Sequence, residues 1–170
     1  IFVFVSEAAA ARVQVAVACL QDSGVLRGAE LRIIELDTAT RRRFPLLRDA
    51  IDESTLVNYV RFYLPKLLPK AVGKVLWVDI DGLVLGDVRT LMSQVFNTKY
   101  SSALLAIVPK RRRGLTPEIG NLSRLYALDG QLHSLVTMRE HAFNAGFIVL
   151  NLQAWRDKDV TAQLEAMIGR

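Results

Sequence analysis

Five short, mainly apolar runs, separated by longer mixed segments, most constrain the fold of this chain. The runs are residues 1–5, 31–36, 74–78, 102–108 and 147–152. A run that is apolar on both faces is typical of a strand buried within a sheet. Helix-length segments occupy 8–21, 54–64, 91–96 and 155–168. For the second, Ser54 is the expected N-cap, and Pro65 and then Pro69 are expected to stop the helix. Strands that alternate with helices predict an α/β fold with a mostly parallel central sheet.

The composition is that of a globular protein, with 51% hydrophobic and 23% charged residues. A length of 170 residues suits one compact domain, and no apolar run approaches the length of a membrane span. The net charge, 22 − 17 = +5, is a mild basic excess that suits a phosphate-bearing ligand, and we expect no nucleic-acid partner. The single Cys19 excludes an internal disulfide, and its apolar stretch of sequence predicts a structural thiol.

Asp79 and Asp81 follow directly after the apolar run 74–78 and stand two residues apart. In an extended backbone, residues at this spacing project to the same side. Two neighbouring carboxylates repel each other unless a cation neutralises them, and Mg²⁺ and Mn²⁺ bind carboxylate and diphosphate oxygens together. Gly82 lets a ligand approach the backbone. The spacing outlines a divalent-cation site, and the alternative is a pair of loop aspartates that cap the next turn.

Other common catalytic patterns are missing from the sequence. It has neither type of glycine-rich phosphate loop, and no Ser-His-Asp or Cys-His pattern. His133 and His141 stand in polar contexts, and we assign neither a role. The basic runs 41–43 and 110–113 are expected to be solvated loops, although the second could also contact an acidic donor or acceptor.

Two segments of the sequence carry a family resemblance. Residues 56–91 read LVNYVRFYLPKLLPKAVGKVLWVDIDGLVLGDVRTL, and residues 141–163 read HAFNAGFIVLNLQAWRDKDVTAQ. Together they resemble glycosyltransferase family 8. The sequences of both segments are most similar to the plant-type galacturonosyltransferase-like branch. The resemblance implies a GT-A fold, a nucleotide-binding α/β sandwich, with residues 1–170 forming a single domain that lacks its C-terminal part. It also implies a retaining transferase of polysaccharide biosynthesis that uses a UDP-sugar, Mn²⁺ or Mg²⁺, and a carbohydrate acceptor.

The resemblance assigns donor and metal roles to matching residues. Asp79 and Asp81 correspond to the pair that binds the metal and the UDP diphosphate. Arg61 corresponds to a helix arginine that contacts the donor, and its alternative is a surface residue paired with a neighbouring acid. Asn151 and Trp155 also match the family, and for Trp155 we expect a packing role.

The resemblance also assigns residues around the sugar and the base. Asn144, Ala145 and Gly146 match the segment that lines the sugar site, where Asn144 supplies the polar, catalytic contact and Gly146 leaves space. Asn144 has the alternative role of capping a strand. Ser6 and Glu7 stand where the family reads the uracil with an acidic pair, and the pair is altered here. No segment after Ala145 matches the family's late histidine ligand, so we expect weak metal and UDP binding by this chain.

Two other functions fit parts of the sequence. Residues 77–87, WVDIDGLVLGD, also resemble the nucleophile loop of haloacid-dehalogenase-type phosphatases, although that loop normally follows the first strand. A catalytically silent binding module that keeps the transferase fold is the third hypothesis, motivated by the altered uracil positions. Resemblance to the plant-type branch implies the Golgi lumen, whereas bacterial-type relatives imply the cytoplasm.

Overall fold

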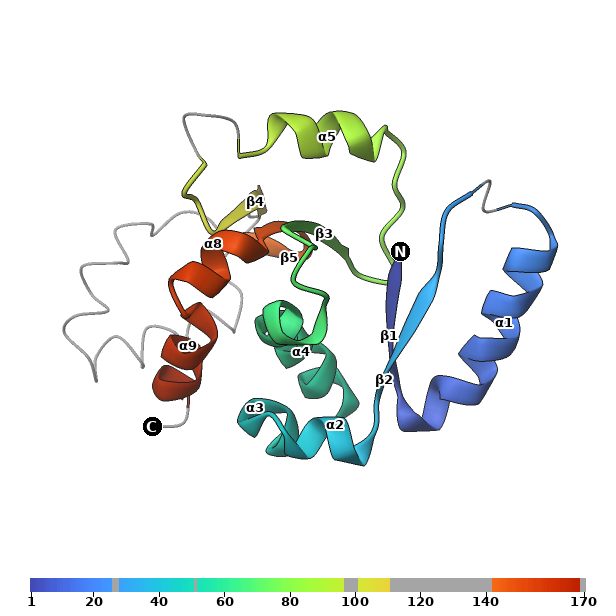
Figure 1. The fold of residues 1–170 in the computed structure, drawn as a ribbon, viewed down its shortest axis with the longest axis horizontal. Helices are drawn as coiled ribbons and strands as arrows, with labels where there is room; N and C mark the ends of the chain where they lie inside the picture. The colour runs from blue at the N-terminus through green and yellow to red at the C-terminus, as the bar shows by residue number, and fades with distance from the viewer. Residues whose placement is uncertain (26–27, 51, 97–100, 111–141, 169–170) are drawn as a thin grey trace. The chain divides into compact units, whose positions relative to one another are not determined.

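The computed structural model describes residues 1–25, 28–50, 52–96, 101–110 and 142–168 (Figure 1). The chain divides into two compact units: unit 1 is Ile1–Ala71 with Trp155–Arg170, and unit 2 is Val72–Ala154. Both units contain helices and strands, which confirms a mixed α/β protein. No helix within the described ranges is long and apolar enough to cross a membrane.

Unit 1 begins with a parallel pair of strands, as the sequence predicts. Strand β1 (Phe2–Ser6) pairs with β2 (Arg32–Leu36), in register from Phe2 with Arg32 to Ser6 with Leu36. A 3-10 turn (Glu7–Ala9) and helix α1 (Ala10–Asp22) connect the two strands. Cys19 is exposed on α1, a helix that is itself largely solvent-exposed, so its apolar stretch of sequence does not form a packed environment around the thiol.

Three helices follow β2, namely α2 (Thr38–Arg42), α3 (Pro45–Arg48) and α4 (Glu53–Leu67). The expected loop at 41–43 is wrong, because Arg41 and Arg42 form the last turn of α2, where cations interact favourably with the helix dipole. Asp37 caps the start of α2 by accepting a hydrogen bond from the Thr40 amide at 2.7 Å. That cap is the local signal that identifies the short helix.

Helix α4 supplies much of the core of unit 1. Leu56, Val60, Tyr63 and Leu64 are at most 1% exposed and recur at helical spacing. The helix begins at a different cap from the predicted Ser54, because the Asp52 carboxylate accepts the Thr55 amide at 2.7 Å.

Pro65 lies inside α4 and does not end it, so the first of the two expected stops is wrong. The helix continues to Leu67, and Leu68 then turns extended with φ −95° and ψ 150°. Leu68 precedes Pro69, and a residue before proline is driven out of the helical region by the proline ring. The second proline of the pair is therefore the one that stops the helix.

The helical C-terminal segment is split in two. The predicted helix over 155–168 is interrupted between α8 (Leu152–Asp157) and α9 (Val160–Ile168). At the break, Asp159 adopts a positive φ of 47°, a conformation in which aspartate is one of the more tolerant residues. Trp155 is 4% exposed and donates from Nε1 to Thr161 Oγ1 at 3.1 Å, so the expected packing role of this tryptophan is confirmed.

Unit 2 contains strands β3 (Lys74–Val78), β4 (Leu105–Lys110) and β5 (Ala142–Asn151), with helix α5 (Val88–Gln94) between the first two. The sheet order is β3-β5-β4, and β5 is antiparallel to both neighbours. The prediction of a mostly parallel sheet is therefore wrong for this unit. Strands β3 and β4 run the same way, as an intervening helix predicts, but β5 inserts between them in the opposite direction.

Candidate functional site

An irregularity in β5 forms one wall of the candidate site. The pairing of β4 with β5 is regular from Leu105 with Leu150 to Ile107 with Ile148, and it resumes at Pro109 with Phe143. Residues 144–147 of β5 therefore lie opposite Val108 alone. A bulge of this kind bends the strand and redirects its side chains, and bulges are frequent beside active sites.

The other edge of β5 stays paired with β3 through the bulge. Val78 pairs with Phe147, and the Asp79 amide donates to the Gly146 carbonyl at 2.9 Å. The bulge therefore lies beside the C-terminal end of β3, next to Asp79. The predicted neighbourhood of Asp79, Asp81, Asn144 and Gly146 occurs in the structure, around one cavity of about 430 Å³. The cavity is lined by Val78, Asp79, Asp81, Gly82, Leu83, Val108, Asn144, Gly146 and Phe147.

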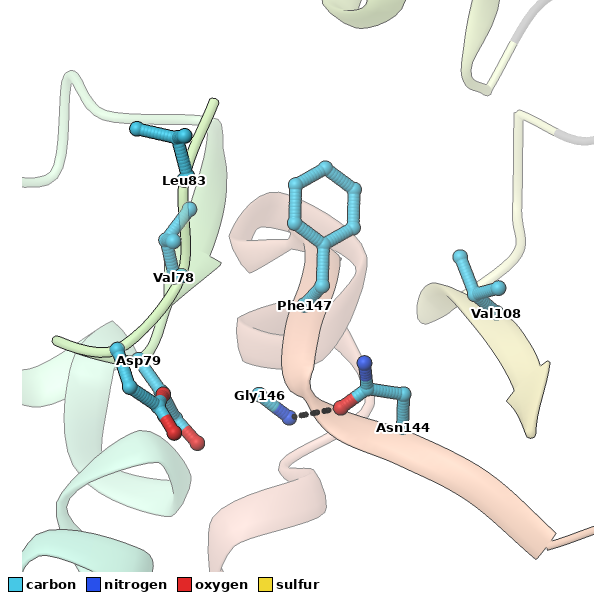
Figure 2. A pocket seen from close by; sticks show the side chains of 9 residues that line it. Val78, Asp79, Leu83, Val108, Asn144, Gly146 and Phe147 are labelled. Carbon is cyan, nitrogen blue, oxygen red and sulfur yellow. Dashed lines mark hydrogen bonds between the residues drawn. The ribbon is translucent and has the colours of Figure 1, made fainter. Parts of the chain in front are cut away.

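Polar and apolar groups occupy different parts of this cavity. In Figure 2 the Asp79 carboxylate lies on one side of Gly146 and the Asn144 amide on the other, while Phe147 and Leu83 lie higher in the view. A volume of about 430 Å³ falls within the range of small-molecule sites, which combine apolar walls with a few placed polar groups.

The two carboxylates reach the cavity by a turn and not by an extended strand. The Gly82 amide donates to the Asp79 carbonyl at 2.8 Å, which closes a turn over Asp79–Gly82. The expected extended geometry of the pair is therefore wrong, although both side chains line the same cavity. A Cβ at position 82 would lie 2.6 Å from Val78 Cγ1, so the turn needs glycine for close packing against its own strand.

Neighbours on both adjoining strands surround the Asp79 carboxylate. Trp77 donates from Nε1 to Asp79 Oδ1 at 2.6 Å. A Cβ at position 146 would lie 2.7 Å from Asp79 Oδ2, so only glycine fits there while the carboxylate keeps this position. Sequence reasoning missed Trp77, although its spacing from Asp79 places both on one face of an extended strand.

Asn144 and Ala145 lie within the bulge, and both are exposed. The Asn144 Oδ1 accepts a hydrogen bond from the Gly146 amide at 3.0 Å, drawn as the dashed line in Figure 2. This bond gives Asn144 a local structural role, close to the capping role of its alternative interpretation. The Asn144 amide nitrogen points away from Gly146 in the same view.

The carboxylate oxygens of Asp79 and Asp81, which line one cavity, are of the type that binds divalent cations. Mg²⁺ and Mn²⁺ prefer carboxylate oxygens, and such ions commonly take only one or two protein carboxylates together with phosphate and water oxygens. Within the described ranges, no group of three acidic, histidine or cysteine side chains gathers to hold a metal. Asp79 and Asp81 therefore supply as many carboxylates as such an ion commonly takes from a protein. The metal and the diphosphate themselves stay predictions.

The other predicted donor residues belong to unit 1. Ser6 ends β1, and the Glu7 carboxylate accepts from Thr38 Oγ1 at 3.2 Å. Arg61 is only 7% exposed and donates to Asn58 Oδ1 at 3.0 Å, so the alternative of a surface arginine is wrong. Donor contacts by these three residues stay predictions. The two histidines, at 133 and 141, and residues 111–113 of the second basic run lie outside the described residues.

Comparisons with known proteins agree on one family. The profile described as Glycosyl transferase family 8 matches residues 29–170. Glycosyltransferase 8 domain-containing protein 1 of Danio rerio is 32% identical over 124 residues, covering 67% of this chain and 33% of that protein. "Probable galacturonosyltransferase-like 3" of Arabidopsis thaliana is 31% identical over 119 residues, covering 70% of this chain and 32% of that protein. The chain thus spans about a third of the length of these relatives.

A solved structure has a similar fold. The apo crystal structure of mouse xyloside xylosyltransferase 1 superposes with a TM-score of 0.56 over 96% of this chain and 56% of that chain, at 18% sequence identity. The likeness supports the predicted transferase-type α/β architecture, with the sheet directions described above.

Proposed function

Because this chain belongs to glycosyl transferase family 8, we propose that it forms the donor-binding part of a retaining transferase that moves a hexose or hexuronic acid from a UDP-sugar to a carbohydrate acceptor. The observation that carries this proposal is the meeting of Asp79, Asp81 and Asn144 at one cavity at the end of β3. Membership in this family favours a transferase over the phosphatase suggested by residues 77–87.

The proposed chemistry is mainly electrostatic. Asp79 and Asp81 bind Mn²⁺ or Mg²⁺, and the cation, when bound, supplies positive charge against the UDP leaving group. Asn144 and the backbone of residues 144–146 orient the donor sugar, because fixed polar groups stabilise developing charge at little reorganisation cost. The apolar side chains of Leu83 and Phe147 line another part of the same cavity and leave the sugar's polar contacts to Asn144 and the backbone.

The family resemblance also assigns donor contacts to residues of unit 1. By that resemblance Ser6 and Glu7 contact the uracil, and Arg61, on α4, contacts the donor. The name of the Arabidopsis thaliana relative suggests a galacturonic acid donor as the first to test, with other UDP-hexoses as the comparison. Action in the Golgi lumen, with the cytoplasm as alternative, is proposed on the same resemblance.

The Asp81→Asn variant tests the proposal. We expect UDP binding by the parent chain to be enhanced by Mn²⁺, and the enhancement to vanish in the variant, because an amide oxygen is a poor replacement for a carboxylate. Isothermal titration of UDP with and without Mn²⁺ measures the effect. Asp87→Asn is the matched control: it removes the same charge from unit 2 at the exposed cap of α5, where an amide also caps.

Product analysis separates the three functions considered. The chain is incubated with Mn²⁺ and a panel of UDP-sugars and then assayed for UDP and for phosphate. UDP release that depends on a carbohydrate acceptor would support a transferase. Phosphate release would contradict a transferase in favour of a phosphatase. Nucleotide binding without any release would favour a silent binding module. Equal Mn²⁺-dependent binding by Asp81→Asn and parent would overturn the metal assignment.

A further inference from the structure

The Asp79 carboxylate is held by a side chain with no assigned role. Trp77 is the second-last residue of β3, and its indole Nε1 donates to Asp79 Oδ1 at 2.6 Å. This distance is at the short end for an N–H donor and a charged acceptor, and hydrogen bonds to ionised acceptors are about twice as strong as neutral ones. The bond therefore restricts the rotation of the Asp79 side chain.

The backbone of Asp79 is held as well. Its amide donates to the Gly146 carbonyl at 2.9 Å, and its own carbonyl accepts from the Gly82 amide at 2.8 Å. With both the backbone and one carboxylate oxygen bonded, the other oxygen, Oδ2, has a defined place beside the Cα of Gly146. Asp81, by contrast, is an exposed residue in the following turn.

We propose that Trp77 is the positioning residue of this site: its indole N–H holds Asp79 Oδ1 and so orients the carboxylate for a divalent cation. The proposal rests on the proposed function, because it assumes that Asp79 is a metal ligand. Residues that donate hydrogen bonds to a metal ligand typically change metal affinity by 10- to 100-fold when they are lost.

The hydrogen bond itself can be observed without any metal. The chain has two tryptophans, at 77 and 155, so selective ¹⁵N labelling of tryptophan produces two indole N–H resonances, which Trp77→Phe assigns. In Asp79→Asn the charged acceptor is lost, and we expect the Trp77 indole proton to shift upfield while the Trp155 resonance stays in place. An unchanged Trp77 resonance would overturn the proposal. The comparison of Asp79→Asn with the parent keeps both tryptophans, and Trp77→Phe serves only to assign the resonances.

Metal affinity supplies the second readout. Titration of Mn²⁺ by electron paramagnetic resonance of the free ion should give roughly 10-fold weaker binding by Trp77→Phe than by the parent. Trp155→Phe is the matched control, since it removes the other indole N–H, whose partner is Thr161 in unit 1. The thermal midpoints of the metal-free variants show whether each still folds.

A double-mutant cycle separates positioning from general destabilisation. If Trp77 acts through Asp79, then adding Trp77→Phe to Asp79→Asn should cause no further loss of Mn²⁺ affinity, whereas adding it to the control variant Asp87→Asn should. Equal Mn²⁺ affinity of Trp77→Phe and parent would overturn this proposal and leave the proposed function intact. Absence of Mn²⁺ binding by the parent would overturn both, whatever the indole resonance does.

Discussion

Gly146 shows how closely a single residue can determine a binding site. Its carbonyl accepts from the Asp79 amide, its amide donates to Asn144 Oδ1 at 3.0 Å, and its missing side chain makes room for the Asp79 carboxylate. A Cβ at this position would meet Asp79 Oδ2 at 2.7 Å and Asn144 Oδ1 at 3.2 Å. The requirement for glycine is therefore one of space around two polar side chains.

Gly146→Ala should weaken Mn²⁺-dependent UDP binding by about 1 to 3 kcal/mol, because the new methyl group displaces the Asp79 carboxylate from its bond with Trp77. Isothermal titration in Mn²⁺ measures the change. Gly73→Ala is the matched control: it lies in the same unit, before β3, and a Cβ there meets nothing within 4 Å. Parent-like affinity in Gly146→Ala would show that Asp79 can move without consequence.

Among the elements, the end of helix α4 is held by a side chain from α8. Arg156 donates from Nε to the Pro65 carbonyl at 3.0 Å and from Nη1 to the Lys70 carbonyl at 3.2 Å. Its Nη2 donates to the Leu68 and Pro69 carbonyls at 3.5 and 3.4 Å. The last carbonyls of a helix lack partners within the helix, and the guanidinium donates to one of them, that of Pro65, and to three carbonyls of the segment that follows. The Trp-Arg pair of the second family segment therefore has a structural role in unit 1.

Arg156→Lys should lower the free energy of unfolding by about 1 to 3 kcal/mol, because one ammonium group cannot reach carbonyls spread around a planar fork. Urea denaturation followed by circular dichroism measures the loss. Arg12→Lys, at an exposed position of α1, is the control and should leave the midpoint unchanged. An equal midpoint for Arg156→Lys and parent would contradict the structural role.

At the scale of the whole molecule, a buried hydroxyl links stability to pH. Tyr63 is fully buried, packs against the Phe44 ring with centroids 4.6 Å apart, and accepts the Leu46 amide at 3.1 Å. Burial raises the pKa of Tyr63 to about 12, and the nearby Glu165 carboxylate acts in the same direction. The ordinary pKa of tyrosine, about 10, applies to the unfolded chain.

The higher pKa of Tyr63 in the folded chain adds to the free energy of unfolding. This contribution should be complete below pH 10 and disappear as the pH rises towards 12. The unfolded chain releases the Tyr63 proton first, so unfolding becomes more favourable over this interval. The pKa difference corresponds to roughly 2 to 3 kcal/mol. Urea denaturation at pH 9 and pH 11.5 should show a larger loss for the parent than for Tyr63→Phe, which has no hydroxyl to titrate. Equal losses would contradict the assignment.

The sequence by itself determined the elements whose signals are local. The bounds of β3 were predicted as observed, since a continuous apolar run and the polar residues after it are properties of neighbouring positions. The same holds for β1, β2 and α1 to within two residues, and for the placing of Asp79 and Asp81 after a buried-type strand.

Tertiary structure decided what depends on residues far apart in the chain. The direction of β5 follows from its partners, because an apolar strand can pair in either direction. The bulge that places Asn144 beside Asp79 exists only where residues 144–147 meet Val108. The bond from Trp77 to Asp79 requires the strand to end and turn where it does. Local patterns predict elements because backbone preferences are local, whereas the site is formed by pairing between strands that the sequence separates.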